Sequence, residues 1–195
     1  RSSGRSLEIG CGDFNISRNL ARHAKDWSFC GSDISQEAID QATKLSMPDE
    51  FDLRVGSLFD PWHKEKFDLI ISDVASISSK IAVLSDWYQG IPYDTGADGL
   101  KQVGKLLPLV ASHMRVGGCF VIPYISLSNY EKQKDMLSDI FCRVTYHNQV
   151  DWPVPKKIIE RLSDVTEYKS SSNYLIKELF GMHIAFTGVA VAYNS

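Results

Sequence analysis

The chain has 195 residues, of which 44% are hydrophobic and 23% charged, as is typical of a soluble globular domain with a sizeable core. Its net charge of -3 and pI of about 6.0 provide no global basic field that would attract nucleic acid. No apolar run approaches the roughly 18 residues that span a bilayer, and no signal peptide is recognisable. We therefore expect one domain, residues 1–195, with no membrane partner.

The cysteines indicate a reducing compartment. Cys11, Cys30, Cys119 and Cys142 are widely separated and form no C-x-x-C pair. We therefore expect reduced thiols in a cytoplasmic protein. The five histidines show no metal-ligand spacing, so the sequence predicts no metal site.

Short apolar runs alternate with helical patterns along the whole chain. The run at 67–74 is apolar enough to be buried on both faces, as in a central parallel strand. In the first helix we expect Ile16, Leu20 and either His23 or Ala24 to face the sheet, and Ser35 to cap the second helix. Strands are predicted at 7–10, 27–30, 51–55, 67–74, 119–125, 142–150 and 183–193. Helices are predicted at 16–24, 36–45, within 77–93, at 100–114 (closed by Gly117 and Gly118), 130–140, 156–162 and 174–180.

This alternation implies an α/β fold, a Rossmann-like doubly wound sheet with helices on both faces. The last two strands are joined by a long polar segment, 151–181, which suits an antiparallel pair better than a helical crossover. Ligands of such sheets bind beyond the carboxyl ends of the strands. The residues to examine there are Gly10, Asp33, Ser57, Asp73 and Tyr124.

The first strand runs into a glycine turn, Glu8-Ile9-Gly10-Cys11-Gly12. Glycines permit the tight turn and let a ligand approach the backbone, because no Cβ intervenes. Glu8 suits a ligand with a cationic end better than one carrying a pyrophosphate. A nicotinamide-dependent oxidoreductase is the competing interpretation. Its dinucleotide-binding motif has a glycine at the position where the chain has Asn15.

These strand-end residues resemble the motifs of class I S-adenosylmethionine-dependent methyltransferases, whose seven-stranded sheet has an antiparallel last strand. The resemblance implies S-adenosyl-L-methionine as cofactor and S-adenosyl-L-homocysteine as product. It places Glu8 near the amino-acid end of the cofactor, Asp33 on the ribose hydroxyls, and Ile34 and Leu58 on either side of the adenine. The family's frequent third glycine falls at Phe14. The cofactor-binding residues implied are Glu8, Gly10, Cys11, Gly12, Asn15, Asp33, Ile34, Ser57, Leu58 and Asp73.

Three further segments, 56–61, 67–73 and 96–118, are similar to the HemK-like branch, which includes glutamine methyltransferases of release factors. That branch carries Asn-Pro-Pro-Tyr after its fourth strand to hold a planar nitrogen, whereas this chain has Asp73-Val74-Ala75-Ser76. Planar nitrogen acceptors are therefore disfavoured. The helical domain that precedes the HemK-like fold is also missing from the sequence, so the chain is expected to be either a small stand-alone enzyme or one domain of a longer protein.

Asp73 is the best candidate for a catalytic residue, because the fourth strand of this fold ends beside the methyl group. It could orient an acceptor or take its proton, and the alternative is a carboxylate that only caps the next segment. Tyr124, Tyr93 and Asp94 are second-rank pocket candidates.

The sequence predicts a methyltransferase acting on an unidentified small molecule. A protein or RNA acceptor and a non-catalytic cofactor-binding partner remain the alternatives. Segment 151–181 is expected to be a substrate-side insertion, in which Trp152, Tyr168 and Tyr174 either bind substrate or pack on the sheet. The oligomeric state is left open.

Overall fold

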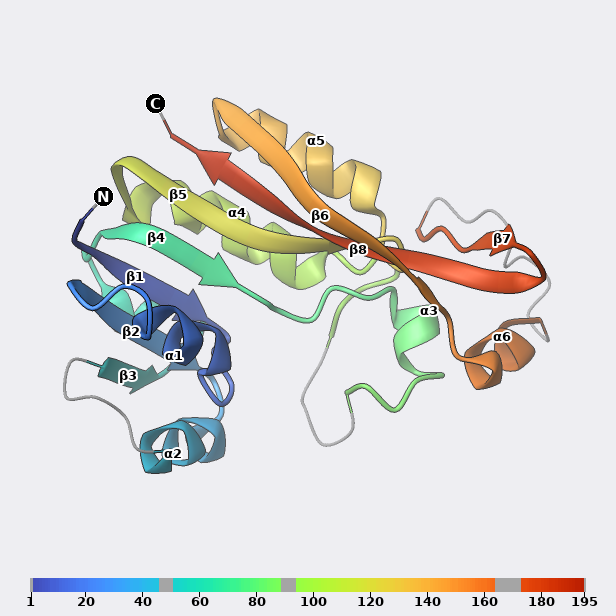
Figure 1. Ribbon diagram of the computed structural model, residues 1–195, viewed down its shortest axis with the longest axis horizontal. Helices are drawn as coiled ribbons and strands as arrows, with labels where there is room; N and C mark the ends of the chain where they lie inside the picture. The colour runs from blue at the N-terminus through green and yellow to red at the C-terminus, as the bar shows by residue number, and fades with distance from the viewer. Residues whose placement is uncertain (1, 46–50, 89–93, 164–172, 195) are drawn as a thin grey trace.

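The computed structural model describes residues 2–45, 51–88, 94–163 and 173–194, and within these ranges eight strands form one mixed sheet (Figure 1). Its order is β3-β2-β1-β4-β5-β8-β6, with β7 paired to β8. Strands β1 to β5 pair in parallel, and β8 is antiparallel to its neighbours β5, β6 and β7. The doubly wound sheet with an antiparallel last strand is confirmed. The strands are β1 (Gly4–Ile9), β2 (Trp27–Asp33), β3 (Phe51–Val55), β4 (Phe67–Ser72), β5 (Met114–Ile125), β6 (Arg143–Pro153), β7 (Lys177–Leu179) and β8 (Met182–Tyr193).

The helices lie on both faces of this sheet, with α1 and α2 over β1–β3 and α4 and α5 behind β4, β5 and β8 (Figure 1). Ser35 caps α2 as predicted, since its hydroxyl accepts a hydrogen bond from the Ala38 N–H at 3.2 Å. Within the described ranges, no helix is long and apolar enough to cross a membrane. The helices are α1 (Asn15–Ala21), α2 (Gln36–Lys44), α3 (Ser79–Ala82), α4 (Lys101–His113), α5 (Tyr130–Ile140) and α6 (Lys156–Ser163), with a 3₁₀ turn η1 (Asp60–Trp62).

Two apolar clusters bear on the site. The main core fills the space between the sheet and α4 and α5, where Phe67, Phe120 and Leu106 are fully buried. A second cluster lies where β6 and β8 extend past the other strands, and it joins α3 and α6 through Ile81 and Ile158. The chain that leaves β4 therefore enters a separately packed region beyond the carboxyl end of that strand.

The predicted helix at 174–180 is wrong, because this segment forms β7 and a hairpin to β8. Phe180 and Gly181 have φ angles of 51° and 75°, the left-handed pair that a two-residue hairpin turn requires. The predicted closure of α4 at Gly117 and Gly118 is also wrong, since α4 ends at His113 and both glycines lie inside β5.

The inward face predicted for α1 is the wrong one. Ile16 and Leu20 are each 37% exposed, whereas Ser17 is fully buried and its backbone N–H donates to Glu8. The side of α1 that faces the sheet therefore carries Ser17, whose N–H binds the buried Glu8 carboxylate, and Ala21, which packs on the cluster around Phe14.

Phe14 occupies the position before α1 with φ 60° and ψ 28°, the left-handed conformation that glycine adopts at low cost. Its ring is fully buried and meets Phe51 edge-on at 5.3 Å between centroids. Gly31 in β2 makes room for it, because a Cβ there would lie 2.6 Å from Phe14 Cε2 and 2.9 Å from Leu53 Cδ2. Phe14 thus keeps a left-handed backbone, where the methyltransferases that the turn resembles often have glycine, because its ring packs into space that Gly31 leaves.

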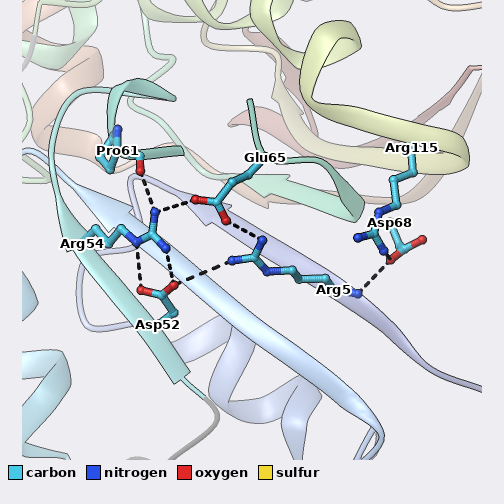
Figure 2. Close-up of polar contacts among 7 residues, drawn as sticks. All are labelled: Arg5, Asp52, Arg54, Pro61, Glu65, Asp68 and Arg115. Carbon is cyan, nitrogen blue, oxygen red and sulfur yellow. Dashed lines mark hydrogen bonds and ion pairs between the residues drawn. The ribbon is translucent and has the colours of Figure 1, made fainter. Parts of the chain in front are cut away.

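Charged side chains cross-link β1, β3 and the segment just before β4, as Figure 2 shows. Arg54 binds Asp52 through two nitrogens, at 2.6 and 3.0 Å, and Glu65 at 2.6 Å. Arg5 binds the other oxygen of Glu65 at 2.5 Å. The Arg54 guanidinium also lies 4.0 Å from the ring centroid of the fully buried Trp62. The network thus ties β1 and β3 to the segment between η1 and β4.

Replacing Glu65 by Gln should lower the free energy of unfolding by about 1 kcal/mol at pH 7, because two arginines lose a half-buried counter-charge. Burial alone would raise the pKa of Glu65, but hydrogen bonds from Arg54 and Arg5 outweigh it and lower that pKa. A lowered pKa means that the stabilisation is complete above the unfolded-state pKa and lost as the pH falls through the folded-state value. The free energies of unfolding of wild type and Glu65→Gln, measured by urea titration, should therefore converge in acid. Glu131→Gln is the control: it removes a charge from an exposed ion pair and should change the free energy of unfolding little at either pH.

Replacing Gly31 by Ala should lower the free energy of unfolding by about 1–3 kcal/mol, because the new methyl group overlaps the Phe14 ring. Gly104→Ala in α4 is the matched control, since its Cβ meets only Met136 Cε at 3.7 Å. That control should be stabilising by up to about 1 kcal/mol, as expected of alanine in a helix. Equal effects in the two variants, measured by urea denaturation, would contradict the assigned role of Gly31.

Candidate active site

A cavity of about 240 Å³ lies at the carboxyl ends of β1 and β4. The sequence predicted five of its lining residues, which come from the first strand, the glycine turn, the start of α1 and the end of β4. These are Glu8, Gly10, Cys11, Asn15 and Asp73. Asp13 and Ile16 also line it and were not predicted. Asp13 could have been predicted as a lining residue, because it is an acidic residue directly after Gly12 and joins Glu8 and Asp73. Ile16 was not predicted to line the cavity, because helical periodicity assigned it to the core.

The glycine turn leaves open backbone beside this cavity. Gly10 and Gly12 have φ angles of 68° and 51°, and a Cβ added at Gly12 would meet nothing within 4 Å. The turn is fixed from the other side, because the Ser32 carbonyl accepts hydrogen bonds from Gly10 N–H at 2.8 Å and Cys11 N–H at 3.1 Å. Cys11 itself is buried, and burial raises the pKa of its thiol, so it remains protonated. The turn therefore offers a held backbone with room for a ligand.

Asp33, at the end of β2, connects this turn to α2. Its two carboxylate oxygens accept hydrogen bonds from the Gly12 N–H and the Ser35 N–H, each at 2.9 Å. The side chain is half-exposed, so each oxygen can still accept from a ligand. Asp33 does not line the cavity itself, but it lies beside the turn that does.

Glu8 is only 3% exposed and points into the space between β1 and α1. It accepts a hydrogen bond from the Ser17 N–H at 2.9 Å. Burial raises the pKa of Glu8, and the charges of Asp13 and Asp73 raise it further, whereas the hydrogen bonds from Ser17 lower it. A cationic ligand group would relieve this repulsion among three carboxylates in one cavity.

Asp73 directly follows β4 and its side chain is open to the cavity mouth. The surrounding walls nevertheless remove enough water to raise the pKa of Asp73. In the described part of the chain, no hydrogen bond to Asp73 opposes that shift. The backbone just before Asp73 is held in place, because Ser72 Oγ donates to the Ile9 carbonyl at 3.2 Å and so ties the end of β4 to β1.

The predicted adenine contacts lie outside the cavity lining. Ile34 is 69% exposed at the end of β2, and Ser57 is exposed beyond the end of β3. Leu58 is half-buried with a positive φ of 48°, and its carbonyl accepts a hydrogen bond from Ser32 Oγ at 3.1 Å. These three residues are thus aligned along the edge next to Asp33, and their adenine role remains a prediction.

The second-rank candidates are separated from Asp73. Tyr124 is buried beneath α5 and packs edge-on to Tyr146, on the face of the sheet opposite the cavity. Asp94 is exposed and ion-paired with Lys101. Tyr93 and Tyr168 lie outside the described residues. Of the aromatic residues in segment 151–181, Tyr174 is buried in the second cluster and Trp152 donates its indole N–H to Thr187 at 3.0 Å, so both pack inward.

Comparisons with known proteins agree with this geometry. A family model described as a methyltransferase domain matches residues 7–89. The solved structure of ribosomal protein L11 methylase from Lactobacillus delbrueckii subsp. bulgaricus is similar with a TM-score of 0.58 and 15% identity, over 99% of this chain and 71% of that one. Precorrin-6y C5,15-methyltransferase from Geobacter metallireducens GS-15 is similar with a TM-score of 0.59 and 11% identity, over 99% and 81% of the two chains. A search of curated proteins found no match.

At such identities the solved structures establish the fold alone. The family model covers less than half of the chain, and the residues it matches include the glycine turn, Asp33 and Asp73. Residues 7–89 are therefore similar to a methyltransferase domain, and the chain has the fold of the solved methyltransferase structures.

Proposed function

We propose that this chain is an S-adenosylmethionine-dependent methyltransferase and that it acts on a small-molecule acceptor, which enters the cavity mouth beside Asp73. The observation that carries the proposal is that Asp73, with an open carboxylate, lines the same small cavity as the glycine turn. The methyl donor and the carboxylate that takes the acceptor's proton would then lie in one cavity, so that donor and acceptor can be aligned.

The lining residues fit S-adenosylmethionine, which when bound supplies an electrophilic methyl group on a cationic sulfonium. Glu8, Asp13 and Asp73 line the cavity without any basic side chain, so its charge suits a cation. The open space at Gly12 admits a ligand against the backbone. We assign the amino-acid end to Glu8, Gly10, Cys11 and Asn15, the ribose to Asp33, and the adenine to Ile34, Ser57 and Leu58.

The role we assign to Asp73 is to orient the acceptor and take its proton. The fixed end of β4 holds the carboxylate at the cavity mouth, so it can accept a hydrogen bond from a hydroxyl or amine. The raised pKa makes this carboxylate a stronger base than an exposed aspartate. Alignment by positioned groups is the main contribution that a protein makes when the electrophile is already reactive.

We place the chain in the HemK-like branch on segments 56–61, 67–73 and 96–118, with a different acceptor because Asp73-Val74-Ala75-Ser76 replaces Asn-Pro-Pro-Tyr. We assign segment 151–181 to the substrate side. Its described part packs through α6 against α3 and against the chain leaving β4. Lys157 supports this packing, since it binds Asp86 at 2.8 Å.

Asp33→Ala should weaken binding of S-adenosylhomocysteine by roughly 10- to 100-fold, because a charge-assisted hydrogen bond to the ribose is lost. Titration calorimetry measures this directly. Asp40→Ala on α2 is the control, since Asp40 is exposed and its carboxylate accepts from Gln36. Wild-type protein that fails to bind S-adenosylhomocysteine would refute the assigned cofactor site.

Asp73→Asn should leave S-adenosylmethionine affinity within a few-fold of wild type, while methyl transfer falls by about 100-fold or more. Transfer of a labelled methyl group to a panel of small amines and alcohols measures the rate. In wild type the rate should rise with pH through the raised pKa of Asp73, because only the carboxylate accepts a proton, and this limb should vanish in the variant. Transfer only to protein or RNA would overturn the small-molecule acceptor, and unchanged rates in Asp73→Asn would remove Asp73 from catalysis.

A further inference from the structure

Three tyrosine rings surround the ammonium group of Lys134, where α5 packs on β5 and β6 and on the face of the sheet opposite the cavity. The Nζ atom lies 4.9 Å from the ring centroid of Tyr130, 5.5 Å from that of Tyr146 and 6.0 Å from that of Tyr124. We call these three residues the tyrosine cage. Its rings come from α5, β6 and β5, so elements far apart in the chain converge on one cation.

Packing holds the walls of the cage. Tyr124 is only 4% exposed and lies against Gly188 of β8, where an added Cβ would be 2.4 Å from the tyrosine Cζ. Tyr146 meets Tyr124 edge-on at 5.5 Å between centroids, and Tyr130 meets Phe186 edge-on at 5.0 Å. The rings are therefore fixed by neighbours other than the lysine, and the cage remains when the lysine leaves.

Negative charge lies beside the cage. Glu131 binds the Lys134 ammonium at 3.4 Å. Burial raises the pKa of Tyr146, and the charges of Glu131 and Asp135 raise it further. Burial and Glu131 likewise raise the pKa of Tyr130. The phenols therefore stay neutral, and their surroundings favour a cation.

The cage is wide for a lysine ammonium. Carbon atoms touch at about 3.5–4.0 Å and an N–C bond adds about 1.5 Å, so a methylated nitrogen fits at about 5 Å from a ring. A bare ammonium would approach more closely. The observed distances of 4.9 to 6.0 Å therefore leave room for methyl groups between the nitrogen and the rings. Methyl groups also weaken the hydration that keeps a lysine ammonium in water.

Lys134 is weakly held in this position. Its side chain is 32% exposed, and an ion pair at such a site contributes little. A cation–π contact near the surface is weak as well. A ligand with a methylated ammonium group can therefore displace Lys134 at a modest loss of affinity.

We propose that the tyrosine cage binds a methylated ammonium group of a ligand, and that Lys134 occupies the cage when this ligand is absent. The three rings contact the methyl groups, and Glu131 and Asp135 balance the charge. Because the cage and the cavity lie on opposite faces of the sheet, this is a second binding site, and it does not rest on the proposed function.

Tetramethylammonium is the probe, with binding followed by NMR titration at constant ionic strength. Wild type should bind it with a Kd on the order of 10 mM. Lys134→Ala should tighten binding by about fivefold or more, because the competing ammonium is removed. Tyr146→Leu should weaken binding by about fivefold or more, because it keeps an apolar side chain but removes a ring. Neutral tert-butanol, which has a similar shape, should not bind.

Lys132→Ala and Tyr193→Leu are the matched controls. Lys132 pairs with Asp98 at 2.8 Å, and Tyr193 lies 3.9 Å from the Arg143 guanidinium, so neither belongs to the cage. Neither change should alter binding, and thermal denaturation checks that every variant is folded. No saturable binding by wild type at about 100 mM, or equal binding of tert-butanol, would overturn the proposal. So would Lys134→Ala that binds no more tightly than wild type.

Two further probes separate the sources of such a group. Choline carries it on a free small molecule, and a short peptide with trimethyllysine carries it on a protein side chain. Tighter binding of choline would identify a small-molecule ligand, and tighter binding of the peptide would identify a methylated protein.

Discussion

The carboxylate of Asp33 joins the parts on which the site depends. It accepts one hydrogen bond from the glycine turn after β1 and one from the start of α2, so two loops from neighbouring strands share a single anchor. The Ser32 carbonyl, one residue earlier, holds the same turn at Gly10 and Cys11. The end of β2 thus shapes the backbone around the cavity, although no side chain of β2 lines it.

The sequence predicted the parts of the fold in which local pattern and tertiary packing agree. The apolar run at 67–74 became β4, and Ser35 capped α2, because burial and capping each require those residue types at those positions. The sequence-based prediction failed where a contact between distant residues outweighed the local hydrophobic pattern. Residues 177–179 pair with β8 instead of forming a helix, and α1 turns Ser17 toward the sheet, where its N–H binds the Glu8 carboxylate.

The same distinction applies to the candidate site. Glu8, Gly10, Cys11, Asn15 and Asp73 were predictable because the carboxyl ends of adjacent parallel strands meet at one edge. Tyr124 was misplaced because side chains alternate along a strand. Its neighbour Pro123 lies on the cavity side of the sheet, so Tyr124 falls under α5. A residue's position at the end of a strand shows that it lies at the ligand-binding edge of the sheet. Only the strand register shows on which face of the sheet its side chain lies.

Different residues of the sheet contribute to stability and to the site. The Arg5–Glu65–Arg54–Asp52 network ties β1 and β3 to the segment that leads into β4, and none of its members lines the cavity (Figure 2). At the carboxyl ends, by contrast, Gly10, Gly12 and Phe14 hold left-handed backbone and three carboxylates crowd one cavity, both of which cost folding free energy. A Phe in that conformation persists only because Gly31 admits its ring. The left-handed backbone is therefore held in place by packing, whereas the repulsion among the carboxylates is a cost that a bound cationic group would relieve.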